Sequence, residues 1–111
     1  QTAIDALTAL FPGGSITGAP KQRAMEIIDE LEFSRRQLYT GTIGYLSLDG
    51  NCDLNIVIRT AVHHDDQYTI GVGGGITAES DEAFEYEEIW QKAKALLSAL
   101  KGDTFNYESY L

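Results

Sequence analysis

The sequence predicts an α+β fold, in which two or three helices pack with an antiparallel sheet of at least three strands. Two observations carry this prediction. Apolar residues recur at helical spacing near both ends of the chain, whereas between Tyr39 and Gly75 the hydrophobic period changes to two. Turn-forming Asp, Gly, Asn and Gln residues interrupt the strand-like region twice, which favours an antiparallel meander.

Two helices are expected before the strands. Residues 2–10 place Ile4, Leu7 and Leu10 on one side, and the sequence Pro12-Gly13-Gly14 ends that pattern. The second helix follows Pro20, which suits a first turn because its missing N–H is not needed there. The apolar positions of this second helix are Ala24, Ile27, Ile28 and Leu31.

The loop between these helices, residues 13–18, carries the hydroxyls of Ser15 and Thr17. A loop at a helix N-terminus favours an anion, through free N–H groups and the helix dipole. The alternative is a capped loop, in which Thr17 or Ser15 bonds the first helical turn. Lys21 lies in that turn, where a positive charge is unfavourable for the dipole, so its position hints at another role.

Three strands are expected over Tyr39–Leu48, Leu54–His63 and Tyr68–Val72, joined by turns at residues 49–51 and 65–67. Arg59 is unusual, because it places a charge in the middle of the second strand. One interpretation is that it reaches the sheet edge or pairs with an acid of the fold. The other is that its guanidinium binds a substrate carboxylate through two hydrogen bonds.

The last expected strand runs into Gly73, Gly74 and Gly75, and a short acidic turn then leads into a helix that extends to Leu100. Glycine leaves backbone N–H donors accessible to a ligand, because no Cβ stands in the way. The helix has an apolar stripe and an opposite polar side. The apolar stripe is Tyr86, Ile89, Ala93, Leu96, Leu97 and Leu100, and the polar side is Glu87, Gln91, Lys94 and Ser98.

Glu85, Glu88 and Lys92 form a third stripe between these two, at the rim of the apolar face, where a side chain is half buried. They are read either as a surface Glu–Lys pair or as a divalent-metal site beside an anion contact. The second interpretation draws on the way proteins hold Mg²⁺, with one or two carboxylates plus waters and substrate oxygens.

Composition restricts the class of protein. The 111 residues suit one domain or a piece of a larger one, and a hydrophobic content of 43% suffices for a core. The net charge of −9 argues against nucleic acid and anionic membranes as partners. The single cysteine, Cys52, excludes an intrachain disulfide, and no apolar segment is long enough to span a membrane. We therefore expect a soluble cytoplasmic protein.

Four motifs occur in order along the chain. They are the Pro12–Lys21 loop (PGGSITGAPK), the Ile58-Arg59-Thr60 strand, the Gly73-Gly74-Gly75-Ile76 turn and the Glu85-x-x-Glu88-x-x-x-Lys92 helix. Together they resemble the C-terminal part of the chorismate-utilising enzymes, from about Leu7 to Leu100. Within that family the loop and the three-glycine turn look most like aminodeoxychorismate synthase component I, which aminates chorismate at C4 in para-aminobenzoate and folate synthesis. Anthranilate synthase component I, isochorismate synthase and salicylate synthase are the alternatives.

The resemblance implies a magnesium cofactor, with Glu88 as a ligand and Glu85 as the acidic partner beside it. It implies that Thr17 and Gly18 line the substrate site. It also implies a glutamine amidotransferase subunit that supplies ammonia. The residues implied to hold the carboxylates of chorismate are Tyr39, Arg59, Lys92 and the amides of Gly73, Gly74 and Gly75.

Family members are far longer than 111 residues, and the resemblance implies that the catalytic lysine and the general acid belong to earlier motifs. We therefore expect residues 1–100 to be the C-terminal part of a chorismate-binding catalytic domain, followed by a tail of residues 101–111. No catalytic residue is expected here, and the chain alone is expected to be inactive. The alternative is a non-catalytic interaction module that keeps the fold. Apolar surface cut from a larger core also favours self-association, as a homodimer.

Overall fold

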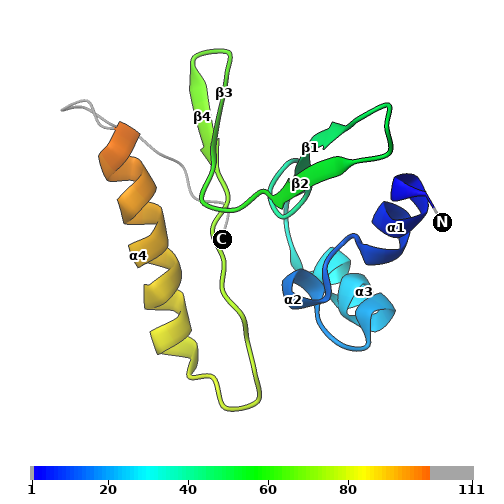
Figure 1. The fold of residues 1–111 in the computed structure, drawn as a ribbon. Helices are drawn as coiled ribbons and strands as arrows, with labels where there is room; N and C mark the ends of the chain where they lie inside the picture. Colours follow the sequence, from blue (N-terminus) through cyan, green and yellow to red (C-terminus); the bar gives the residue numbers. More distant parts are fainter. Residues whose placement is uncertain (1, 101–111) are drawn as a thin grey trace. The chain divides into compact units, whose positions relative to one another are not determined.

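The structure, a computed structural model, describes residues 2–100. These residues divide into two compact units, one up to residue 57 and one from residue 58 onward. Figure 1 shows the helices and hairpins of each. The predicted tail, residues 101–111, lies outside the described residues. Within residues 2–100, no helix is both long enough and apolar enough to cross a membrane.

The first unit begins with three helices, α1 (Ala3–Leu10), α2 (Gly14–Thr17) and α3 (Lys21–Leu31). Thr2 and Asp5 cap α1 reciprocally: the Thr2 hydroxyl accepts from the Asp5 N–H at 3.2 Å, and the Asp5 carboxylate accepts from the Thr2 N–H at 3.0 Å. The single turn α2 packs against α3. Both predicted helices are confirmed, but Pro20 is the N-cap of α3 and not a residue of its first turn.

A β-hairpin completes the first unit. Strands β1 (Thr42–Leu46) and β2 (Cys52–Ile56) pair antiparallel, with Thr42 opposite Ile56. The turn at residues 49–51 is confirmed. Its Gly50 has φ 93°, in the left-handed region that favours glycine, and the Asp49 carboxylate accepts from the Asn51 N–H at 3.1 Å.

The second unit holds another hairpin and one long helix. Strands β3 (Ala61–His64) and β4 (Gln67–Ile70) pair antiparallel, and Asp65 and Asp66 turn between them with φ 49° and 60°. Two positive φ values match the turns that suit the twist of a tight hairpin, and Asp tolerates them better than most residues do. Helix α4 (Glu82–Leu100) then begins after Asp81, whose carboxylate accepts from the Phe84 N–H at 2.9 Å.

The α+β class is confirmed, but the predicted three-stranded meander is wrong. The described residues contain two separate two-stranded sheets, β1–β2 and β3–β4. The expected middle strand divides at residues 57–60. The cause is Arg59, whose φ of 49° ends the extended conformation. Up to Val57 the pairing with the first strand continues: the Val57 N–H donates to Gly41 O at 2.9 Å and its carbonyl accepts from the Thr40 N–H at 2.7 Å.

Little apolar surface is buried. Among residues 2–100, the buried hydrophobic residues are Val57 and Ala93. Large apolar side chains such as Phe33, 90% exposed, face solvent. Tyr86, assigned to the apolar stripe of α4, is 52% exposed, so that assignment is wrong. Such open apolar faces are what self-association requires, and the homodimer stays a prediction.

Gly44 tests the register of the first hairpin. An added Cβ at this position would lie 2.0 Å from Asp53 O and 2.7 Å from Leu54 Cα, both backbone atoms that cannot turn away. Gly44→Ala should lower the free energy of unfolding by about 3 kcal/mol, the upper end of the usual cost of overpacking. Urea unfolding of the full-length protein measures this change. Gly14→Ala is the control, because its Cβ would meet no atom within 4 Å. Equal stability of the two variants would contradict the register.

Candidate functional site

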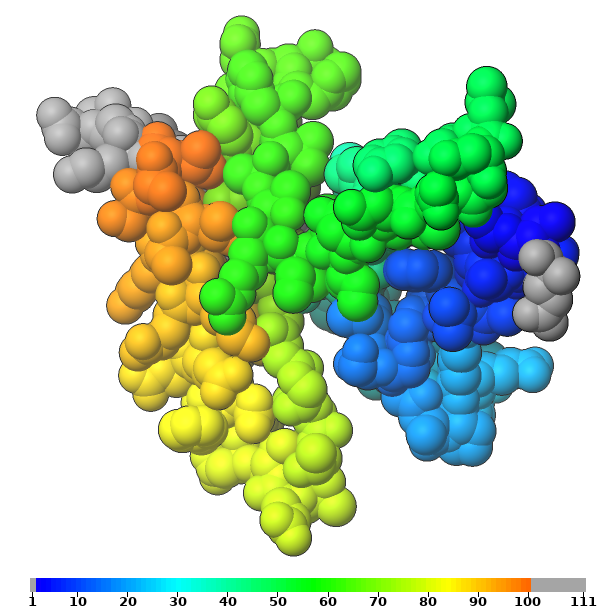
Figure 2. All heavy atoms as spheres, in the orientation of Figure 1, coloured from blue at the N-terminus to red at the C-terminus, as the bar shows by residue number. Residues whose placement is uncertain are grey.

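The segment from residue 71 to residue 81 runs alongside α4 (Figures 1 and 2), and contacts of Gly73 and Gly74 with the helix show that the two lie close together. Lys92 joins the segment to the helix. Its ammonium donates to the carbonyl oxygen of Gly73 at 3.2 Å and lies 3.3 Å from Glu88 Oε1. Both charged side chains are half buried, with 35% of Lys92 and 42% of Glu88 exposed. The predicted half-buried stripe of Glu85, Glu88 and Lys92 is therefore confirmed. It faces Gly73–Gly75, which we call the glycine segment.

Gly74 lies directly opposite the two glutamates. An added Cβ would stand 3.5 Å from Glu85 Oε2 and 3.9 Å from Glu88 Oε1, whereas a Cβ on Gly75 would meet no atom of the described residues within 4 Å. Two carboxylate oxygens thus converge on the open side of one glycine. The N–H groups of Gly73, Gly74 and Gly75 make no backbone hydrogen bond with another described residue, so they remain available to an anion.

This donor set fits part of a magnesium site. Glu85 and Glu88 offer hard oxygen ligands, as Mg²⁺ prefers, and the ion ordinarily completes its shell with waters and substrate oxygens. Within residues 2–100, no group of three or more His, Cys, Asp or Glu side chains could hold a metal ion. Helix α4 would thus contribute two carboxylates to a metal site, Glu85 and Glu88. The charge of Glu88 is already offset by its ion pair with Lys92.

The polar side of α4 is confirmed as exposed, Glu87 included. Glu87 and Glu88 nevertheless border the same shallow hollow, together with Phe84 and Gln91. The two glutamates differ in their partners: Glu88 pairs with Lys92, and Glu87 makes no hydrogen bond or ion pair with the other described residues.

Thr17 and Gly18 have structural duties of their own in the first unit. The Thr17 hydroxyl donates to Gly13 O at 3.0 Å, inside α2. The alternative of a capped loop, in which Thr17 or Ser15 bonds the first turn of the next helix, is therefore wrong, since α3 has no side-chain cap among the described residues. Gly18 has φ 142°, and an added Cβ would stand 3.0 Å from Ala24 Cβ. Glycine is required there whether or not a substrate is bound.

Tyr39 is half buried, in the turn that precedes β1. The guanidinium carbon of Arg36 lies 5.8 Å from the centre of its ring. Burial raises the pKa of the Tyr39 phenol, and the positive charge of Arg36 acts in the opposite direction. Sequence analysis missed Arg36. The signal that would have found it is a glutamate four residues earlier, Glu32, which is the spacing of a local ion pair.

Arg59 does not have the position expected of it. It is exposed and lies between β2 and β3 instead of within a strand. Among residues 2–100, it forms no ion pair with an acid of the fold. The guanidinium is therefore not engaged by the described residues, which leaves the interpretation as a carboxylate-binding group open to test.

The structure brings together part of the predicted set. Glu85, Glu88 and Lys92 meet the glycine segment within the second unit, and Arg59 belongs to the same unit. Thr17, Gly18 and Tyr39 belong to the first unit.

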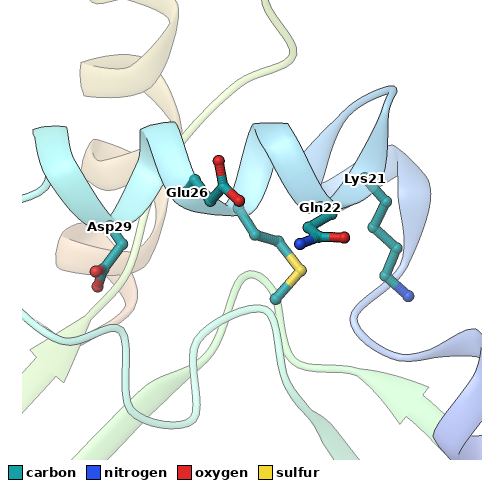
Figure 3. Close-up of a pocket in the computed structure, with 5 residues that line it drawn as sticks. Lys21, Gln22, Glu26 and Asp29 are labelled. Carbon is teal, nitrogen blue, oxygen red and sulfur yellow. The ribbon is translucent and has the colours of Figure 1, made fainter.

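A separate hollow of about 550 Å³ lies along α3 in the first unit (Figure 3). It includes Lys21, the lysine whose position in the first turn suggested another role, and Met25. Its remaining lining residues are Gln22, Glu26 and Asp29. None of the predicted substrate or metal residues borders it, so the candidate site is the one on α4.

Comparison with known proteins identifies the family. A family model described as chorismate binding enzyme matches residues 1–98. The chain belongs to the chorismate-binding enzyme family. It is 56% identical over 102 residues to an anthranilate synthase component I-like protein of Synechocystis sp., which covers 92% of this chain and 21% of that protein.

Two other relatives are named anthranilate synthase component 1. The Haloarcula marismortui protein (component 1 3) is 55% identical over 96 residues, covering 86% of this chain and 19% of its own length. The Mycobacterium tuberculosis protein is 49% identical over 100 residues, covering 90% and 19%. The chain therefore spans about a fifth of the length of these curated relatives. Their names favour the alternative kept above, anthranilate synthase component I, over aminodeoxychorismate synthase component I.

Gly74 offers a test of the site that leaves its charges untouched. Gly74→Ala would fill the space faced by Glu85 and Glu88 at ordinary van der Waals distances, so the protein should keep its stability. Magnesium binding should weaken by about 10-fold, because the methyl group displaces ligand water or metal. Calorimetric titration of Mg²⁺ into the full-length protein measures this. Gly75→Ala is the matched control, and equal magnesium affinity in both variants would contradict the geometry.

Proposed function

We propose that this chain is the C-terminal part of an enzyme of the anthranilate synthase component I type, which aminates chorismate with Mg²⁺ as cofactor. The observation that carries the proposal is the set of relatives with this name, at 49–56% identity over nearly the whole chain. The arrangement of Glu85, Glu88 and Lys92 around the glycine segment supports it, because these groups suit a dianionic substrate and a hard cation.

Each element of the site has a role in this proposal. Glu85 and Glu88 hold Mg²⁺, which when bound would offset the charge of a substrate carboxylate beside the two acids. Lys92 and Arg59 bind and orient carboxylates of chorismate, together with the N–H groups of Gly73–Gly75. Thr17, Gly18 and Tyr39 line the substrate site. A glutamine amidotransferase subunit supplies the ammonia.

Aminodeoxychorismate synthase component I is the second candidate, and a specific observation favours it. The loop Gly13–Lys21 and the turn Gly73–Ile76 carry the residues that resemble this subfamily. The two activities use the same substrate and the same nucleophile. They differ in the product, because anthranilate carries its amino group next to the ring carboxylate, whereas 4-amino-4-deoxychorismate carries it at C4 and keeps the enolpyruvyl group.

The product therefore separates the two candidates. The full-length protein, given chorismate, ammonia and Mg²⁺, should release equal amounts of anthranilate and pyruvate, with water as the third product. Liquid chromatography with mass detection measures both. Formation of 4-amino-4-deoxychorismate without pyruvate would establish the second candidate instead. The 111-residue chain is the control and should show no turnover. Absence of chorismate binding to the full-length protein would favour the interaction module.

The metal role is tested by two neighbouring glutamates. Glu88→Gln in the full-length protein should lower Mg²⁺-dependent activity by about 100-fold or more, since Gln offers a neutral oxygen in place of an anionic ligand. Glu87→Gln makes the same change in net charge on the exposed side of the helix and should leave the rate nearly unchanged. Magnesium titration of the activity distinguishes them. A loss confined to Glu87→Gln would show that the site assignment is wrong.

A further inference from the structure

Arg36 is the most highly connected charged side chain of the first unit. It lies in the segment that follows α3, four residues after Glu32. Its Nε donates to both carboxylate oxygens of Glu32, at 3.0 and 2.9 Å. Its Nη1 donates to the Thr40 hydroxyl at 3.2 Å. The guanidinium carbon also lies over the ring of Tyr39, 5.8 Å from the centre. The side chain is 27% exposed, so these contacts are partly shielded from water.

These contacts link the end of a helix to a turn. Glu32 is the C-cap of α3, fixed by its N–H bond to Ile28 O at 3.0 Å. The turn closes through the Tyr39 N–H, which donates to Arg36 O at 3.1 Å. Thr40, at the far end, bonds Val57, the most buried hydrophobic residue of the described chain. The Arg36 guanidinium therefore links Glu32, at the end of α3, to Thr40, which is bonded to Val57. Tyr39, the residue before Thr40, has its ring against the same guanidinium.

We propose that Arg36 is a positioning residue for Tyr39, whose guanidinium sets where the phenol stands in the substrate site. The inference rests on the proposed function, because Tyr39 contacts substrate only if that proposal holds. A planar guanidinium can bond Glu32, bond Thr40 and keep a face toward the ring at once. A lysine ammonium is a point charge without a planar set of donors, so it cannot make these three contacts at once. Lysine would therefore keep the positive charge of Arg36 but not its geometry.

Kinetics of the full-length protein test the proposal. Arg36→Met keeps a stem of similar length and removes the fork. It should raise KM for chorismate by about 10-fold, the lower end of the effect of losing hydrogen bonds to a charged group, and change kcat far less. Arg36→Lys should not restore KM. Adding Tyr39→Phe to Arg36→Met should raise KM little further, because both act through one contact.

Arg23 provides a matched control. It also pairs with a glutamate on α3, Glu26, at 3.0 Å, but it is 60% exposed and has no further partner among the described residues. Arg23→Met should leave KM unchanged. The proposal is overturned if Tyr39→Phe raises KM while Arg36→Met leaves it unchanged, or if the effects of the two substitutions add in full.

A spectroscopic measurement without substrate separates this inference from the proposed function. In protein labelled with 3-fluorotyrosine, the ¹⁹F signal of residue 39 is the one missing from Tyr39→Phe. Arg36→Met should move this signal and raise the pKa of its phenol, because the lost positive charge stabilised the phenolate. Arg23→Met should not. An unmoved signal overturns the positioning role. A moved signal, with KM unaltered in Tyr39→Phe, supports positioning and overturns the substrate contact of Tyr39.

Discussion

The ammonium of Lys92 connects the two parts of the candidate site that could bind a ligand. One is the segment Gly73–Gly75, whose N–H groups make no backbone hydrogen bond with residues 2–100, and the other is the pair of carboxylates on α4, Glu85 and Glu88. Lys92 bonds the carbonyl of Gly73 and pairs with Glu88, at 3.2 and 3.3 Å. Because these contacts are half buried, they are less screened than a surface pair. With Gly73 held against the helix, Gly74 faces Glu85 and Glu88, and no other side chain of residues 2–100 lies within 4 Å of a Cβ added to Gly74.

The same contact explains why the site suits a metal and an anion together. Two neighbouring carboxylates on one helix repel each other, and a cation four residues later offsets part of that repulsion. A divalent ion at Gly74 would take over this task from Lys92. The ammonium would then be available to a substrate carboxylate. Chorismate, the proposed substrate, is a dianion, and a chain of net charge −9 would have to bind it through local cations and amides.

The sequence predicted those structural features that depend on residues close together in the chain. Helices α1, α3 and α4, both hairpin turns and the half-buried stripe of Glu85, Glu88 and Lys92 follow from helical spacing and turn chemistry. The single turn α2 does not, because its residues were expected to form a loop. The break between β2 and β3 does not, because it depends on a positive φ at Arg59, which no residue pattern indicates. Arg36 was missed because its contacts with Thr40 and Tyr39 form only when the turn is folded. The preference within the family rested on a few loop residues, and the names of the relatives favour the other member.

Backbone ¹⁵N relaxation of the glycine segment tests the central claim most directly, which is that Lys92 holds Gly73 and its neighbours against α4. In the full-length protein without ligands, Lys92→Met should lower the N–H order parameters of Gly73, Gly74 and Gly75, since the segment loses its bond to the helix. Lys94→Met removes an exposed lysine of the same helix and is the control, which should leave the order parameters unchanged. A loss of order confined to Lys92→Met is the predicted result. Equal order parameters in the two variants and the unmodified protein would contradict the account.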